Sequence, residues 1–211
     1  MMLGARTGAW AKSGETPKYL GVELVGSGVS VSDGWLSTTS YTSYGLLPVF
    51  SPSDKDIVFV CEIETASLSG NQGFFGGLGS NNTFTPFWKD TLPFGDNSCS
   101  PFIGTGGSNW NIARGTSDTI GPIFLENTVF DLKFVRNGSS LEWYVANNGT
   151  WEKKKTIIST LPIGSGNLQI GTNRGTNNRF LGRVNLSKSW IRLDGELWWE
   201  GTLGANKRLA D

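Results

Sequence analysis

The sequence of 211 residues contains no histidine and only two cysteines, Cys61 and Cys99. Without an imidazole there can be no Ser-His-Asp or Cys-His nucleophile and no His-ligated metal. Two cysteines are too few for a four-cysteine zinc site or a disulfide-rich scaffold. We therefore expect neither a cofactor nor a metal centre, and the only acid–base chemistry left is that of carboxylates.

The chain also lacks a surplus of either charge, since it has eighteen Lys and Arg against eighteen Asp and Glu. Proteins that bind nucleic acid usually carry a basic surplus that neutralises phosphate, so we expect no nucleic-acid partner. The lysine run at 153–155 is predicted to lie on an exposed strand.

Long apolar runs are missing as well. No stretch approaches the ~20 residues that span a bilayer, so membrane insertion is not expected. Residues 1–18 lack the apolar core of a signal peptide, which predicts synthesis in a cytoplasm and reduced cysteines. The Asn-x-Ser/Thr triplets that begin at Asn81, Asn137, Asn148 and Asn185 would carry glycan only on a secretory route.

What is abundant is glycine, with 29 residues, and tryptophan, with nine. Short β-branched and aromatic runs recur between turn signals, and no window of about 12 residues shows an uninterrupted helical period. The pattern predicts an all-β, two-sheet antiparallel sandwich over residues 21–204. Residues 1–20 are predicted to form an N-terminal arm, and residues 205–211 a polar tail.

Residues 56–64 alternate most clearly. We expect Ile57, Phe59, Cys61 and Ile63 to face the core, which makes Cys61 a packing residue. A meander of three strands is predicted at 128–136, 141–146 and 151–159, because Asn137-Gly138 and Asn147-Asn148-Gly149 are strong turn signals.

The last strands contain a change of phase. Val184 and Leu186 are apolar at even positions, whereas Ile191 and Leu193 are apolar at odd ones. A straight strand cannot keep both pairs inside, so a bulge is predicted near residues 187–189. Asp194-Gly195 predicts a hairpin turn, after which Trp198 and Trp199 are expected to point to opposite faces.

Carboxylate pairs offer the one catalytic alternative, glycoside hydrolysis. Glu62 and Glu64 share a strand face, ~7 Å apart by strand geometry. The Glu-x-Asp-x-x-Glu strand of β-sandwich glucanases is not matched, because Glu64 and Ser67 stand at its second and third positions. A solvated polar strand is the favoured interpretation, and no catalytic residue is assigned.

Two further ligand types can be considered. Asp33, Asp118 and Asp131 could offer oxygen ligands to calcium, but no dense Asp/Asn run supports a metal site. Tryptophans in loops can stack on sugar rings. The candidate glycan-binding residues, outside or at the rims of the predicted strands, are Trp88, Trp110 and Trp151, with core or interface packing as the alternative for each.

Two stretches carry a resemblance to a known family. Near the start, Asp33-Gly34 lies between two short strands and is followed by Phe50-Ser51-Pro52 and the apolar strand at 57–63. Near the end, residues 180–201 supply a strand, Asp194-Gly195 and Trp198-Trp199. With the hairpin between them, these stretches resemble concanavalin-like (laminin-G-like) jelly-roll domains of bacteriophage structural proteins.

The resemblance implies a jelly roll and a place in a virion, as tail fibre, baseplate, head fibre or capsid decoration. It brings no catalytic residues, since the matched positions are turn and core residues. We expect a non-enzymatic virion protein, made in the host cytoplasm, that docks on other virion proteins through its N-terminal arm. We expect it to form a homo-oligomer, namely a trimer. Host-surface glycan is the candidate ligand. The alternatives are a concanavalin-like glycoside hydrolase using Glu62 and Glu64, and a secreted lectin-like module.

Overall fold

A computed structural model describes residues 19–40, 42–77, 84–89, 97–99, 101–106, 109–112, 120–147, 149–173 and 178–201. Every regular element in these ranges is a β-strand. No helix long and apolar enough to cross a membrane occurs in them. The all-β prediction is confirmed.

The larger of the two main sheets has nine strands. Their bounds are β1 Tyr19–Leu20, β3 Val29–Ser32, β4 Trp35–Thr38, β6 Ile57–Thr65, β14 Thr128–Asn137, β15 Ser140–Asn147, β16 Thr150–Ile158, β20 Gly182–Leu193 and β21 Glu196–Glu200. Seven run in the order β1-β21-β20-β6-β14-β15-β16, and the β3–β4 hairpin joins β20. The predicted meander is β14, β15 and β16.

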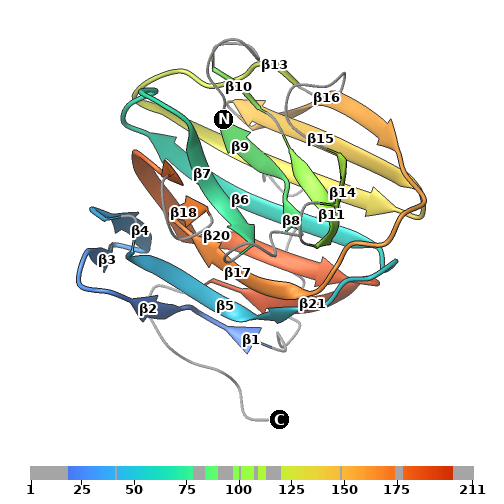
Figure 1. Ribbon diagram of the computed structural model, residues 1–211. Coiled ribbons are helices and arrows are strands. Elements are labelled where there is room, and N and C mark those ends of the chain that lie inside the picture. Colours follow the sequence, from blue (N-terminus) through green and yellow to red (C-terminus); the bar gives the residue numbers. More distant parts are fainter. Residues whose placement is uncertain are drawn as a thin grey trace, which may run out of the picture.

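The second main sheet has seven strands in the order β13-β10-β9-β7-β17-β5-β2. Their bounds are β2 Glu23–Val25, β5 Tyr44–Phe50, β7 Gln72–Gly77, β9 Phe87–Lys89, β10 Ser98–Cys99, β13 Ile120–Pro122 and β17 Gly166–Ile170. Two small sheets hold β8 Phe84–Thr85, β11 Phe102–Gly106 and β12 Asn109–Ile112, and β18 Thr172–Asn173 with β19 Asn178–Arg179. The two main sheets lie one in front of the other as a jelly-roll sandwich (Figure 1).

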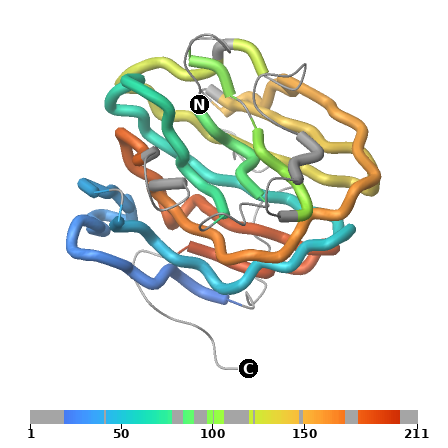
Figure 2. The backbone as a smooth tube through the Cα atoms, viewed as in Figure 1, coloured from blue at the N-terminus to red at the C-terminus, as the bar shows by residue number. Residues whose placement is uncertain are grey.

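One strand pair in the larger sheet is parallel. Tyr19 lies opposite Trp199 and Leu20 opposite Glu200, so β1 runs in the same direction as β21. The Gly21 N–H donates to the Glu200 carbonyl at 2.8 Å, and Trp199 Nε1 donates to the Gly21 carbonyl at 2.6 Å. The two ends of the described chain therefore lie side by side (Figure 2). The last two residues of the predicted arm form this strand, while residues 1–18 and 205–211 lie outside the described residues.

Aromatic rings fill the space between the sheets. Phe59 of β6 lies 4.4 Å from Phe75 of β7, centroid to centroid, and Phe134 of β14 lies 5.4 Å from Phe84 of β8. Cys61 is buried in this core with the rest of its predicted face. Burial raises the pKa of the Cys61 thiol well above its usual value, so the thiol stays protonated and inert.

The predicted bulge in β20 is present. Asn185 pairs with Glu62 of β6, and the next pair joins Trp190 to Val60, so residues 186–189 have no partner on β6. Ser189 Oγ donates to the Asn185 carbonyl at 2.6 Å and closes the bulge. Leu186 and Ile191 both reach the core as a result, which resolves the change of phase.

The prediction that Trp198 and Trp199 point to opposite faces is wrong. Ile191 of β20 lies opposite Trp199, and Arg192 lies opposite Leu197, so Trp198 is an extra residue on β21. Such a bulge breaks the alternation of side chains. Both tryptophans therefore join the main core, and Leu197 packs on the outer face of the sheet.

Candidate functional site

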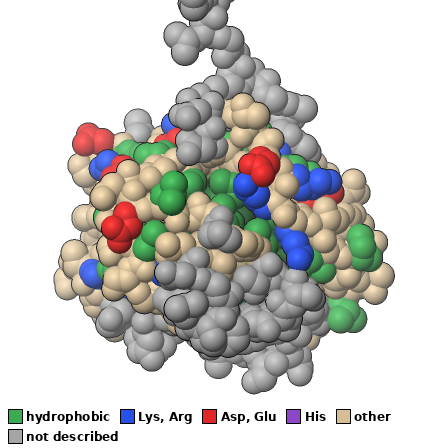
Figure 3. Space-filling model, turned by 90° about the horizontal axis from the view of Figure 1, so that it is seen from above, with side chains coloured by type: hydrophobic (Ala, Val, Ile, Leu, Met, Phe, Trp, Pro, Cys, Tyr) green, Lys and Arg blue, Asp and Glu red, His purple; other side chains and the backbone are tan. Residues whose placement is uncertain are grey.

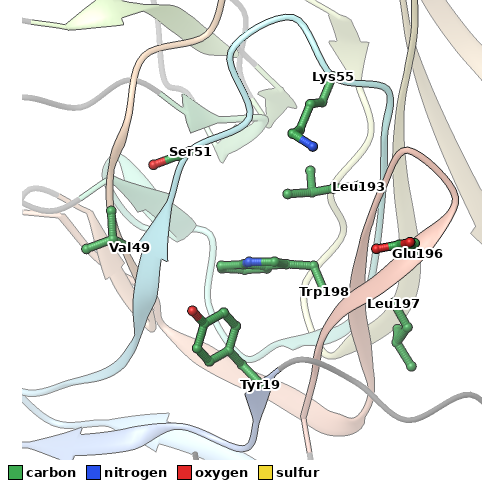
Figure 4. A pocket seen from close by; sticks show the side chains of 8 residues that line it. All are labelled: Tyr19, Val49, Ser51, Lys55, Leu193, Glu196, Leu197 and Trp198. Atoms are coloured by element: carbon green, nitrogen blue, oxygen red, sulfur yellow. The ribbon is translucent and has the colours of Figure 1, made fainter. Parts of the chain in front are cut away.

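A pocket of about 410 Å³ opens where β1, the end of β5 and the β20–β21 hairpin meet (Figure 4). Its size is within the usual range for small-molecule sites. The residues that line it are Tyr19, Val49, Ser51, Lys55, Leu193, Glu196, Leu197 and Trp198.

Two aromatic rings form the apolar part of the pocket together with Val49, Leu193 and Leu197. The bulge in β21 aims Trp198 inward, and its ring lies near the centre of the pocket, with Tyr19 beside it (Figure 4). The centroids of Tyr19 and Trp198 are 5.4 Å apart at an interplanar angle of 66°, and Phe50 contacts the same indole edge-to-face at 5.1 Å. These edge-to-face contacts hold the indole in one orientation.

Lys55 supplies a fixed positive charge on the rim. Its Nζ lies 2.9 Å from Oδ2 of Asp194, and both side chains of this ion pair are exposed to solvent. Oδ1 of Asp194 accepts the Asp56 N–H at 3.0 Å, so the carboxylate cannot swing away. The hydrogen bond that Lys55 donates to Asp194 raises the pKa of Lys55 and lowers the pKa of Asp194. Asp194 has positive φ, as its predicted turn requires, and also orients the pocket lysine.

Glu196 and Ser51 complete the polar groups of the pocket. An ionised carboxylate accepts hydrogen bonds only, an ammonium donates only, and a hydroxyl does both. An aromatic face beside such a set can bind the apolar C–H face of a sugar ring while its hydroxyls are hydrogen-bonded. The arrangement offers a bound ligand an aromatic face and a set of hydrogen-bonding groups.

The three tryptophans proposed from the sequence lie in strands of three different sheets. Trp88 is in β9, is only 5% exposed and packs edge-to-face on Phe102. Trp110 is in β12, and its side chain lies outside what the structure describes. Trp151 is half-buried in β16, with Nζ of Lys133 4.5 Å from its ring centroid.

Trp151 also lines a second pocket, of about 480 Å³, at the outer edge of the larger sheet. Its lining residues are Ile123, Leu125, Phe130, Val145, Thr150, Trp151, Glu152 and Lys154. Glu152 and Lys154 bond to each other at 2.6 Å on its rim. This pocket is therefore an apolar hollow whose rim charges neutralise each other.

Glu62 and Glu64 lie on the outer face of the larger sheet, and neither lines either pocket. Oε2 of Glu64 accepts from Nε and a terminal nitrogen of Arg183 at 3.1 and 2.8 Å. Glu62 is 4% exposed and accepts from Asn185 Nδ2 at 2.7 Å and from Lys188 Nζ at 2.5 Å. Both carboxylates are thus held by cationic or amide partners.

The calcium candidates are also scattered. Asp33 lies in the β3–β4 turn, Asp131 in β14, and Asp118 outside the described residues. Within the described ranges, no group of three or more Cys, Asp or Glu side chains is placed to hold a metal ion. On the described part of the face in Figure 3, basic and acidic side chains are interspersed with apolar ones.

Sequence reasoning missed the main pocket residues, Tyr19 and Trp198. A signal for Trp198 existed, because Leu197, Trp198 and Trp199 are consecutive apolar residues between two glutamates. Such a run does not fit simple alternation and favours a bulge. Tyr19 gave no signal, because its place depends on pairing with the far end of the chain.

No protein-family model and no curated protein matches the chain. Among solved structures it is similar to the carbohydrate binding module CBM66 from Bacillus subtilis, with a TM-score of 0.50 at 12% identity over 84% of this chain and 98% of that one. A Trypanosoma rangeli sialidase matches with a TM-score of 0.53 at 13% identity over 83% of this chain. Bacteriophage CBA120 tailspike protein 2 matches with a TM-score of 0.52 at 12% identity over 88% of this chain.

The chain spans only 27% of that sialidase chain and 30% of that tailspike chain. At these identities the likeness establishes the fold, which is a jelly-roll β-sandwich of the kind found in carbohydrate-binding and glycosidase-type domains.

Proposed function

We propose that the protein is a non-enzymatic, carbohydrate-binding β-sandwich subunit of a bacteriophage virion. The observation that carries the binding role is the pocket of Figure 4, which is lined by the Trp198 and Tyr19 rings and by Lys55, Glu196 and Ser51. Similarity to a carbohydrate binding module over 98% of that module's length supports the same role.

The virion role has separate support. The sequence resembles jelly-roll domains of phage structural proteins, and the fold is similar to part of a phage tailspike. We propose that residues 1–18 dock the subunit on other virion proteins, that the subunit forms a homo-oligomer such as a trimer, and that it is made in the host cytoplasm. The parallel pairing of β1 gives the arm a fixed point of departure at Tyr19.

A binding experiment on the full chain tests the carbohydrate role. We expect the wild type to bind a subset of an array of bacterial surface glycans, and Tyr19→Ala to weaken that binding about tenfold or more, since one ring of the pocket is lost. Trp151→Ala is the matched control, because it removes a half-buried ring from the second pocket instead. Melting temperatures of both variants report whether the sandwich is intact.

Loss of binding in Trp151→Ala alone would move the site to the second pocket. A wild type that binds no glycan at about 10 mM would overturn the carbohydrate role.

A second candidate is a glycoside hydrolase, favoured by the position of Glu62 and Glu64 on one strand face. Its test is the double variant Glu62→Gln/Glu64→Gln on any polysaccharide that the wild type cleaves. Because a general acid and a nucleophile are both removed in that mechanism, cleavage should fall by several orders of magnitude. Unchanged cleavage removes this candidate.

A further inference from the structure

We infer that the pocket of Figure 4 takes a neutral hexose residue and rejects acidic sugars. This inference rests on the proposed carbohydrate role and names the ligand class of the same site. It follows from three properties of the pocket: the balance of charge on its rim, the direction of its hydrogen bonds, and its shape.

The rim carries an excess of negative charge. The ammonium of Lys55 is already paired with Asp194 at 2.9 Å. Glu196 lies across the pocket from Ser51 and is exposed (Figure 4). Among the described residues, Glu196 makes no ion pair and no side-chain hydrogen bond. Lys55 is the one cation that lines the described pocket, and Asp194 and Glu196 both act on its charge, so the three groups together carry one net negative charge.

That charge selects against an acidic ligand. The carboxylate of a uronic or sialic acid would lie close to Glu196, and like charges brought together in an interface weaken binding. Lys55 could donate a remaining ammonium hydrogen to such a ligand, but its charge is already balanced by Asp194, whose other oxygen is fixed by the Asp56 N–H. The rim thus offers an acidic sugar more repulsion than attraction.

The same groups suit a ligand rich in hydroxyls. Both oxygens of Glu196 can accept from neighbouring hydroxyls, while Ser51 can donate or accept. Lys55 keeps ammonium hydrogens beyond the one that it donates to Asp194. A neutral hexose presents donors and acceptors on adjacent carbons and one apolar C–H face. That face would lie against Trp198 and Tyr19, whose rings meet at 66° and form a corner.

The experiment compares matched neutral and acidic oligosaccharides by calorimetric titration of the full chain. The probes are lactose against 3′-sialyllactose, and cellobiose and maltose against disaccharides with a terminal glucuronate. We expect the wild type to prefer at least one neutral probe over its acidic counterpart by about tenfold or more. Glu196→Lys should reverse that preference, because the rim becomes positive. Glu152→Lys makes the same change of charge on exposed β16, outside the pocket, and should leave the preference unaltered.

The outcomes separate the inference from the function on which it rests. A wild type that binds an acidic probe more tightly than its neutral counterpart, and loses that binding in Lys55→Met, overturns the neutral-sugar inference and leaves the carbohydrate role standing. A preference that Glu196→Lys and Glu152→Lys shift equally also overturns it, since the effect is then one of net charge. Absence of binding to every probe and to the glycan array overturns the proposed function itself.

Discussion

Among single residues, Glu62 is a buried carboxylate on the outer face of the larger sheet. Asn185 donates to one of its oxygens and Lys188 to the other. Oδ1 of Asn185 in turn accepts from the N–H and the hydroxyl of Ser187, at 3.1 and 2.7 Å. Ser187 and Lys188 belong to the β20 bulge and Asn185 directly precedes it, so this segment covers the Glu62 carboxylate and Lys188 balances its charge.

Asn185→Ala should therefore lower the free energy of unfolding by about 2 kcal/mol, because a buried carboxylate loses a hydrogen-bond donor. Urea unfolding at neutral pH measures the change. Glu64→Gln is the control, since the Glu64–Arg183 pair is partly exposed and such pairs contribute about 1 kcal/mol or less. Equal losses in the two variants would contradict the role given to the bulge.

Tyr144 lies on the same outer face as Glu62. Desolvation, followed by its hydrogen bond to Glu142, raises the pKa of Tyr144 to about 12. The ammonium of Lys133 lies 4.1 Å from the ring centroid of Tyr144. Burial lowers the pKa of Lys133, because the ammonium is desolvated on this face. Because desolvation and the hydrogen bond to Glu142 both disfavour the phenolate of Tyr144, the folded protein favours the neutral phenol.

A tyrosine whose pKa is higher in the folded than in the unfolded state stabilises the fold below its unfolded pKa, about 10. That contribution is lost as the pH rises from about 10 towards 12. We expect the difference in unfolding free energy between wild type and Tyr144→Phe to be constant near neutral pH and to shrink across this window. Spectrophotometric titration gives a direct check: if the phenolate signal that Tyr144→Phe removes has its midpoint near 10, the assignment is wrong.

At the scale of elements, local patterns in the sequence were enough for much of the larger sheet. The meander follows from Asn-Gly-type turns, and the bulge in β20 follows from the phase of four apolar residues. The parallel pairing of β1 with β21 could not be predicted, because it joins residues about 180 positions apart and depends on only two residue pairs. The pocket could not be predicted from the sequence for the same reason, because Tyr19 and residues 193–198 of its wall are far apart in the chain.

Gly201, directly after β21, allows the close approach of that strand to the β20 bulge. Its N–H donates to the Ser189 carbonyl at 2.9 Å, and an added Cβ would lie 2.2 Å from the Leu186 carbonyl oxygen. Gly201→Ala should cost about 3 kcal/mol, because backbone atoms of the bulge must move. Gly195→Ala should cost about 1 kcal/mol, since that turn glycine has positive φ but open space around it. Thermal unfolding of both variants tests which substitution destabilises the protein more. A larger loss in Gly195→Ala than in Gly201→Ala would contradict the close approach of β21 to the bulge.

At the scale of the whole molecule, the larger sheet has an edge at β16 that is protected by charge. Lys153 and Lys154 are exposed on this strand, as predicted, and they pair with Glu142 and Glu152, respectively. Charged side chains on an edge strand hinder pairing with other chains. The opposite edge carries β1, which leads back to the arm.

Deletion of residues 1–18 should abolish incorporation into particles and leave the sandwich folded, because β1 and its bonds to β21 remain. Mass spectrometry of purified particles measures incorporation, and the melting temperature of the purified chain reports folding. Deletion of residues 205–211 serves as the control and should leave incorporation intact. Particles that retain the chain without its first 18 residues would show that docking does not use the arm.

Tyr19 belongs both to β1 and to the wall of the pocket. A mechanical load applied through the arm reaches this residue before any other described residue. The two residue pairs with β21, the hydrogen bonds of Gly21 and the contact with Trp198 resist its displacement, so the load passes directly into the wall of the pocket. Under the proposed function, tension on the arm would therefore strain the wall of the pocket and weaken the binding of a glycan there.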